Sequence, residues 1–350
     1  MYSRRSRARL LPYHRQGGAA LVVALLVFAL SASLVVAMRA EFTRYFARST
    51  NLLESEQAHA YLRGAEELAV LVLLADYDID TQNQQVRDDL TEQWAGPAQP
   101  FLLDEGGWLR GQLEDLDRRF NLNTLAPAAP DQQTGKRERT PNQEQFIRLL
   151  QALGEDSVSE GEAVQITESI GDWIDEDQFP LPDGAEDDFY LGREPEHRAP
   201  NRAMTSTSEL LSIANVTPQL YRALLPYVRV WPAVVSTADS TINLHTAPAA
   251  ILRTIAEKDD LQPLSEADGQ ALVEYREEQG FVDKADFFKH PALGGGQKQL
   301  TDVQPLFAEE SSYFLLTADV EVAERNLRLY SVLHRNGRKI ENLVRSTGAL

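Results

Sequence analysis

The sequence predicts an α+β protein in which a long N-terminal helix packs on a small antiparallel sheet, with a large all-α domain inserted in that sheet. Three observations lead to this prediction. A helical pattern runs without proline from about Ala19 to about Leu74, alternating strand patterns occur both before and after the middle of the chain, and capped helical patterns fill the region between them. The chain of 350 residues is long enough to form more than one hydrophobic core.

The first part of the long helix, residues 19–38, is predicted to cross a membrane. It contains no charged residue, and about 20 apolar residues match the thickness of the hydrocarbon core of a bilayer. The residues before it carry no acidic group and five arginines, Arg4, Arg5, Arg7, Arg9 and Arg15. The positive-inside rule therefore places residues 1–18 in the cytosol and the rest beyond the membrane. A cleavable secretory signal is the alternative, although its apolar core is shorter, at about 7–15 residues.

Residues 39–76 are predicted to continue the helix beyond the membrane. Apolar and aromatic side chains recur there at three- and four-residue steps, which is the period of an amphipathic helix. The candidates for packing against partner helices are Phe42, Tyr45, Phe46, Leu52 and Leu53. Some of them are expected to face the protein's own sheet, and the pattern does not divide the two sets.

The sheet is predicted to form from two distant parts of the chain. Residues 77–125 are expected to hold its first strands and residues 309–350 its last ones. Asn336-Gly337 separates two alternating runs, which is a strong hairpin signal. The intervening residues 126–308 show successive helical patterns and are expected to form the inserted domain.

Two short segments near the insertion resemble each other. RFNLNTLAP begins at Arg119 and TINLHTAPA begins at Thr241, and both contain an apolar-Asn-Leu-polar-Thr core. An Asn or Thr in this position can cap a following helix. The repetition indicates two related helical subdomains.

Composition argues against several classes of function. The formal net charge is −19, and loss of the five arginines of residues 1–18 leaves −24, which disfavours a nucleic-acid surface on the exported part. The absence of cysteine excludes disulfides and thiol nucleophiles. The six histidines are scattered, and neither a G-x-S-x-G motif nor a P-loop occurs, so we predict that the protein is not an enzyme.

The densest acidic cluster lies in WIDEDQFPLPDGAEDDFYLG, which begins at Trp173. Its carboxylates repel one another unless they are solvated or bound to a hard cation, and calcium takes six to eight oxygen ligands from such loops. The spacing of an EF-hand is absent. Composition alone leaves a solvated loop and a calcium site as open alternatives.

The chain resembles the type IV pilins and pseudopilins in its basic leader, its glycine before an apolar helix, and its sheet after that helix. In that plan a prepilin peptidase cuts after a glycine on the cytosolic side, which implies cleavage between Gly18 and Ala19. Most members carry Glu five residues past the cut, where this sequence has Val23. The minor pseudopilin K family of type II secretion systems is similar in lacking the Glu. RFNLNTLA, WIDEDQ, GAEDDFYL, ANVTPQLYRALLPYV, TINLHTAP and SYFLLTADV resemble its segments, in the same order.

This resemblance implies a pilin-like fold whose insertion is of the helix-hairpin-helix or SAM-like kind. It implies an inner-membrane, single-pass protein with a periplasmic C-terminal domain, which initiates or caps the pseudopilus tip together with the I-type and J-type minor pseudopilins. The function of such a protein would be in the export of folded proteins across the outer membrane. Further implied partners are the H-type and major pseudopilins, the prepilin peptidase and the inner-membrane assembly platform, but no nucleic acid. Val23 suits a tip, because a carboxylate in the bilayer without a neighbouring amine would be costly.

The resemblance also implies a calcium site in the acidic loop. At the matching positions, the expected ligands are Asp175, Asp177, Glu186 and Asp187, with Asp183, Asp188 and Asn201 in reserve.

A membrane-anchored periplasmic DNA receptor is the alternative function. TINLHTAPAAILRTIA and LVEYREEQGFVDKADFF resemble helix-hairpin-helix domains, including those of DNA receptors in competent bacteria. The intervening AEKDDLQPLSEADG lacks the paired glycines that would present backbone amides to phosphate, and it is acidic. Both features disfavour DNA binding.

Overall fold

The structure, a computed structural model, describes residues 17–350 apart from residues 105, 131–136, 237–239, 324 and 349–350. The chain divides into two compact units, residues 1–58 and residues 59–350. Most of the predicted leader, residues 1–16, lies outside the described residues.

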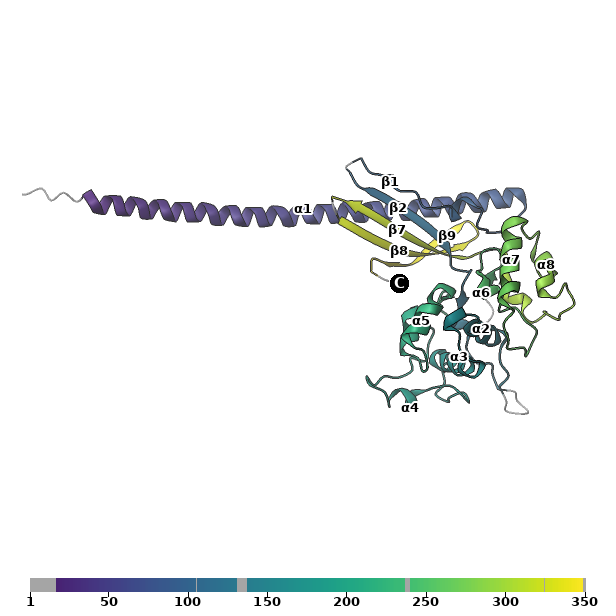
Figure 1. The fold of residues 1–350 in the computed structure, drawn as a ribbon. Helices are drawn as coiled ribbons and strands as arrows, with labels where there is room; N and C mark the ends of the chain where they lie inside the picture. The colour runs from purple at the N-terminus through teal and green to yellow at the C-terminus, as the bar shows by residue number, and fades with distance from the viewer. Residues whose placement is uncertain (1–16, 105, 131–136, 237–239, 324, 349–350) are drawn as a thin grey trace, which may run out of the picture. The chain divides into compact units, whose positions relative to one another are not determined.

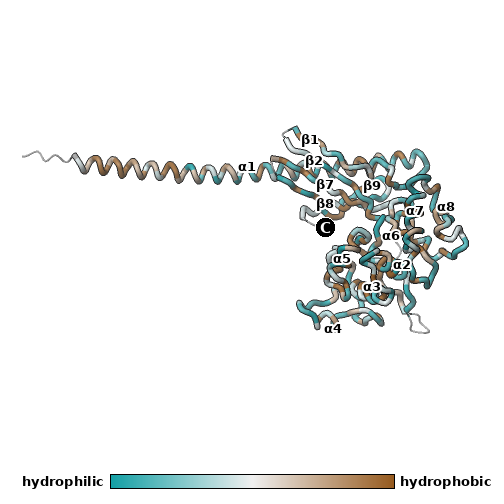
Figure 2. The backbone as a smooth tube through the Cα atoms, viewed as in Figure 1, coloured by the Kyte–Doolittle hydropathy of each residue, from teal (hydrophilic) through white to brown (hydrophobic). Residues whose placement is uncertain are grey.

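Helix α1 (Gly17–Asn83) forms the described part of the first unit and continues into the second. Its first part is apolar, as Figure 2 shows, and it is long enough to cross a membrane. Its end was predicted wrongly, because the helix continues past Leu74 to Asn83. The additional residues are mostly polar and lack apolar periodicity, but ion pairs hold them: Asp76 pairs with Arg335 of β8, and Asp78 pairs with Arg338 in the turn between β8 and β9.

The second unit contains the predicted antiparallel sheet, with the strand order β1-β2-β7-β8-β9 (Figure 1). Its strands are β1 (Phe101–Leu102), β2 (Trp108–Asp115), β7 (Tyr313–Val322), β8 (Arg325–Asn336) and β9 (Lys339–Ser346). Strand β2 pairs with β7 along its whole length, from Trp108 opposite Glu321 to Asp115 opposite Phe314. This pairing confirms that the helical domain is inserted within the sheet.

The last hairpin forms as predicted, but its turn lies one residue later. Asn336 pairs with Lys339, so the two turn residues are Gly337 and Arg338 rather than Asn336-Gly337. Gly337 has a φ of +57°, a conformation that glycine adopts without a steric penalty.

A stripe of α1 packs against one face of the sheet. The stripe consists of Leu62, Ala65, Ala69 and Leu73, which are buried at helical spacing. Beside it the buried Glu66 carboxylate accepts a hydrogen bond from Ser331 Oγ of β8 (2.6 Å) and pairs with Arg345 of β9 (2.5 Å). Strand β7 turns alternate residues inward, Phe314, Leu316, Ala318, Val320 and Val322.

The inserted domain lies beyond the end of the sheet where β2 ends and β7 begins (Figure 1). Its α-helices are α2 (Pro141–Gln151), α3 (Glu160–Ile174), α4 (Asp187–Tyr190), α5 (Pro218–Leu224), α6 (Ala249–Leu252), α7 (Glu266–Glu278) and α8 (Lys284–Phe287). Capping boxes start α2, at Thr140 with Gln143, and α3, at Ser159 with Glu162. One hydrophobic core, from Phe120 to Phe307, joins these helices.

The two similar segments form the same local structure. In β3 (Phe120–Asn121) the Asn121 side chain accepts the Asn123 amide at 3.1 Å, and in β5 (Ile242–Asn243) Asn243 accepts the His245 amide at 2.9 Å. Strand β3 then pairs in parallel with β4 (Val228–Arg229), and β5 with β6 (Phe307–Ala308). The domain therefore consists of two subdomains, each closed by a short parallel strand pair.

Candidate functional site

The acidic loop brings three carboxylates together between α3 and α4. Helix α3 ends at Ile174, Asp175 is its C-cap, and Glu186 directly precedes α4. One carboxylate oxygen from each of Asp175, Asp177 and Glu186 lies within 4.8 Å of the other two. We call these three residues the acidic trio.

Several oxygens of this site are buried without a hydrogen-bond partner among the described residues. They are both carboxylate oxygens of Asp175, both of Glu186, and Oδ1 of Asn201. Asn201 is held at the loop, because its Nδ2 donates to the Asp177 carbonyl oxygen at 2.7 Å. A merely solvated loop would leave such oxygens open to water, whereas buried charged oxygens need a partner. The donor set, all oxygen, fits a hard cation such as calcium.

The electrostatics of the trio agree with this interpretation. Burial, together with the charge of Asp177, raises the pKa of Asp175 to about 6. Burial, together with the charge of Asp175, raises the pKa of Glu186 to about 7. The pKa of Asp177 is lowered, because the Phe179 amide donates to its carboxylate and Arg137 pairs with it.

Asp172 and Gly184 hold the loop in its fold. The fully buried Asp172 carboxylate accepts the Leu181 amide at 3.1 Å. Gly184 lies so close that a Cβ there would be 2.0 Å from Asp172 Oδ2. Only glycine fits this position without displacing the carboxylate that supports the loop.

The structure separates the other expected ligands from the trio. The Asp187 carboxylate accepts hydrogen bonds from Arg198 and from the Ala199 amide, both at 3.1 Å. Asp187 is the first residue of α4, directly after Glu186, and its carboxylate pairs with Arg198. Asp183 and Asp188 are exposed. Proximity to Glu186 in the sequence therefore did not identify the members of the trio. Asn201, which was expected only as a reserve ligand, lies at the site.

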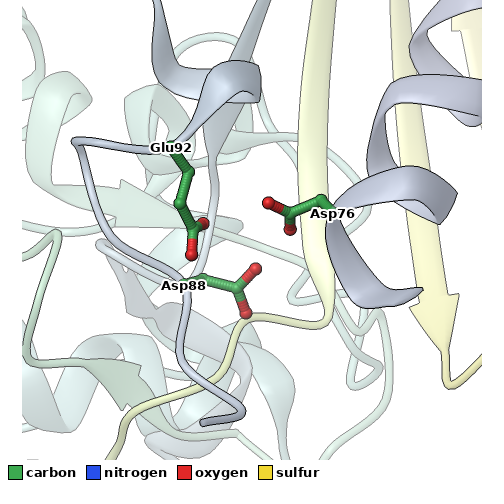
Figure 3. Close-up of side chains that lie close together, drawn as sticks. All are labelled: Asp76, Asp88 and Glu92. Carbon is green, nitrogen blue, oxygen red and sulfur yellow. The ribbon is translucent and has the colours of Figure 1, made fainter. Parts of the chain in front are cut away.

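A second acidic cluster was missed by the sequence analysis. Figure 3 shows the carboxylates of Asp76, Asp88 and Glu92 pointing toward one another, and their nearest oxygens lie within 4.8 Å. Asp76 belongs to α1, and the other two lie in the chain between α1 and the sheet. They are scattered over seventeen residues that show no motif.

The second cluster contains its own cation. Arg335 of β8 donates to both carboxylate oxygens of Asp88 at 2.5 Å and to Asp76 at 3.2 Å. Burial, followed by the charge of Asp88, raises the pKa of Asp76 to about 7, and burial, followed by the charge of Asp76, raises the pKa of Glu92 to about 8. Trp94 Nε1 donates to Glu92 at 2.5 Å. Arg335 and Trp94 thus supply hydrogen-bond donors to all three carboxylates of this cluster, whereas Asp175 and Glu186 of the trio have none among the described residues.

The predicted helix-packing residues all lie in the first unit and are exposed. The exposed fractions run from 63 to 73% for Phe42, Tyr45, Phe46, Leu52 and Leu53, and Val23 is 61% exposed. Some of the five were expected to face the sheet, but all five are exposed, and the first buried residue of the described part of α1 is Ala58. A continuous apolar surface on α1 is therefore available to lipid or to other helices.

Comparison with known proteins gives consistent results along the chain. Two family models, both described as type II secretion system protein K, match residues 118–233 and 242–306, one for each subdomain. Type II secretion system protein K of Pseudomonas aeruginosa is 33% identical over 338 residues, which are 95% of this chain and 93% of the relative. The protein K of Pectobacterium carotovorum subsp. carotovorum is 31% identical over 336 residues, which are 95% and 97% of the two chains.

A solved structure is similar in fold as well. A chain in the crystal structure of the GspK–GspI–GspJ complex, from the type II secretion system of enterotoxigenic Escherichia coli, superposes with a TM-score of 0.69 at 27% identity. The match covers 87% of this chain and all of that one. From the anchor-length helix, the interrupted sheet and these similarities together, we conclude that the chain belongs to the type II secretion system protein K family of minor pseudopilins.

Proposed function

We propose that this protein stands at the tip of a type II secretion pseudopilus, where it initiates or caps assembly together with two smaller minor pseudopilins. The observation that supports the proposal is the similarity, over 87% of this chain, to a chain from a solved complex of GspK with GspI and GspJ. Val23 supports it, because a subunit with no neighbour above it needs no carboxylate in its membrane helix. The inserted domain, at one end of the sheet, would block further stacking.

The proposed setting is the inner membrane, with the N-terminus in the cytosol and residues from about 39 onward in the periplasm. The arginines before the apolar span support this orientation. A prepilin peptidase would remove residues 1–18, and the exposed apolar face of α1 would pack on partner helices. The H-type and major pseudopilins and the assembly platform are the further proposed partners in exporting folded proteins.

We also propose that the acidic trio binds calcium. Asp175, Asp177 and Glu186 would supply carboxylate oxygens and Asn201 its Oδ1. The oxygens of Asp175 and Glu186 and Oδ1 of Asn201 are the ones that the fold buries without partners. A divalent cation there would offset part of the negative charge of the loop and join α3 to α4. Its contribution is to the stability of the inserted domain.

The tip role is tested by assembly. The mature chain in detergent, mixed with the I-type and J-type pseudopilins of the same cell, is expected to form a stable ternary complex whose mass equals one copy of each. Size-exclusion chromatography with light scattering measures this mass, with calcium and with chelator. Three separate peaks would contradict the proposal, and accompanying retention of duplex DNA at physiological salt would favour the receptor function instead.

Calcium binding is tested by thermal unfolding of the mature chain in detergent. Calcium at about a hundred times its Kd is expected to add ~2.7 kcal/mol to the stability of the folded state, so chelator lowers the melting temperature by several degrees. Glu186→Gln removes a buried oxygen charge and should abolish this difference. Asp188→Asn removes an exposed charge of the same loop and should preserve it. A wild-type melting curve that chelator leaves unchanged would refute the site.

A further inference from the structure

Arg137 contacts the acidic trio. Its Nη2 lies 3.1 Å from Asp177 Oδ2, and among the described residues this is the ion pair that reaches the trio. The other two members, Asp175 and Glu186, keep their buried oxygens without hydrogen-bond partners in the same part of the chain. One guanidinium therefore offsets part of the charge of three carboxylates.

A divalent cation and this guanidinium would compete for the same oxygen. Asp177 Oδ2 accepts from Arg137, while Asp177 Oδ1 accepts the Phe179 amide at 2.8 Å. Both oxygens thus have one donor each, and a metal bound through the Asp177 side chain would lie close to them. A neutral amide can stay, because each carboxylate oxygen has a second lone pair, whereas the positive guanidinium repels the cation. The amide is fixed by the loop backbone, whereas the arginine lies on a flexible side chain, so Arg137 is the donor that can leave.

Release of Arg137 requires little reorganisation. Its side chain is already 26% exposed, and Asp177 is 39% exposed, so the pair is partly screened by solvent. Arg137 also lines an open cavity of about 830 Å³ beside the loop, into which the guanidinium can turn. The ion pair is therefore weak enough for a divalent cation to replace it.

We infer that Arg137 is an internal counter-ion of the calcium site, which stabilises the loop while the cation is absent and is displaced when it binds. The inference rests on the proposed calcium site. The displaced arginine lies in the segment 137–139 that forms one wall of the cavity. Cation binding at the trio is thereby linked to the charge of that wall, and Arg137 sets the affinity of the site.

The experiment measures calcium affinity by calorimetry, at low ionic strength, on the mature full chain in detergent. Arg137→Gln is expected to bind calcium at least about fivefold more tightly than the wild type, because the competing charge is gone. Its melting temperature should be lower than that of the wild type in chelator and equal to it in saturating calcium. A merely structural arginine would lower the melting temperature in both conditions.

Arg139→Gln is the matched control. Arg139 is two residues away and 43% exposed, and it pairs with Glu168 at 3.7 Å rather than with the trio. Arg139→Gln should leave the calcium affinity unchanged. The calcium affinity of Arg137→Lys should lie between those of Arg137→Gln and the wild type. Equal tightening by both glutamine variants, or none by Arg137→Gln, would overturn the inference while leaving the calcium site intact. Absence of calcium binding by the wild type would instead refute the site and the inference together.

Discussion

Replacing Arg335 with methionine is expected to lower the free energy of unfolding by about 3–5 kcal/mol, the range for removing one partner of a buried ion pair. Arg335 is 6% exposed, and its partners Asp76 and Asp88 are 8% and 1% exposed. Its guanidinium also donates to the Ser311 carbonyl oxygen at 2.9 Å. Without it, two carboxylates stay buried beside the third carboxylate of the cluster, Glu92, with no cation to offset them.

The loss in Arg335→Met should be smaller at pH 5 than at pH 8. The folded-state pKa values of Asp76, about 7, and Glu92, about 8, lie well above the ordinary values of these carboxyl groups, because both groups are buried beside other carboxylates. Between about pH 4 and pH 8 the folded protein therefore binds more protons than the unfolded chain, and this contribution to stability falls as the pH rises. Without the arginine charge the carboxyl groups retain protons more strongly, and protonation at pH 5 removes the repulsion.

Urea unfolding of the mature chain in detergent, followed by tryptophan fluorescence at both pH values, measures this effect. Trp94, which is buried and donates to Glu92, reports on the cluster directly. Arg338→Met is the matched control, because Arg338 pairs with Asp78 but is 71% exposed, and such pairs contribute about 0–1 kcal/mol. Equal losses in the two variants would show that the buried pair has no special role.

Replacing Gly18 with leucine is expected to abolish removal of residues 1–18 when the chain is co-expressed with a prepilin peptidase. The family resemblance implies that the peptidase cuts directly after Gly18. A Cβ at Gly18 would meet no heavy atom within 4 Å, so the substitution leaves the folded chain unstrained. Any loss of processing therefore reflects recognition by the peptidase rather than misfolding.

Intact-mass measurement distinguishes the precursor from a product that begins at Ala19. Gly64→Leu is the control, because Gly64 lies on the same helix and is also free of neighbours within 4 Å. It should be processed like the wild type. Cleavage of Gly18→Leu at the normal position would refute the proposed peptidase site.

The order of elements could be predicted because each one has a local signal. The apolar span, the alternation in β7 and β8, and the caps of α2 and α3 are all visible within a few residues. The last nine residues of α1 could not be predicted, because their support comes from arginines more than 250 positions away. Tertiary contacts override local propensity there.

The two acidic clusters also differ in how much of each could be recognised in the sequence. The trio lies within twelve residues, so its density was visible, although the sequence could not show that α4 begins at Asp187 and turns that carboxylate toward Arg198. The cluster around Arg335 unites α1, the following loop and β8, and no spacing in the sequence connects them. What could have indicated it is the alternation of β8, which places Arg335 on the same buried face as Ser331 and Leu333.

The pairing of β2 with β7 has a consequence for the order of folding. Trp108 of β2 meets Glu321 of β7 across 213 positions of sequence, and three of the five strands come from the last forty residues of the chain. Such distant contacts form slowly, because a long loop must close before they stabilise anything. A chain synthesised from its N-terminus must therefore hold β2 and α1 without β7 until synthesis is nearly finished. Only a chain that includes β7, β8 and β9 can complete the sheet. A product truncated before β7 would therefore leave β1 and β2 unfolded and accessible to proteases.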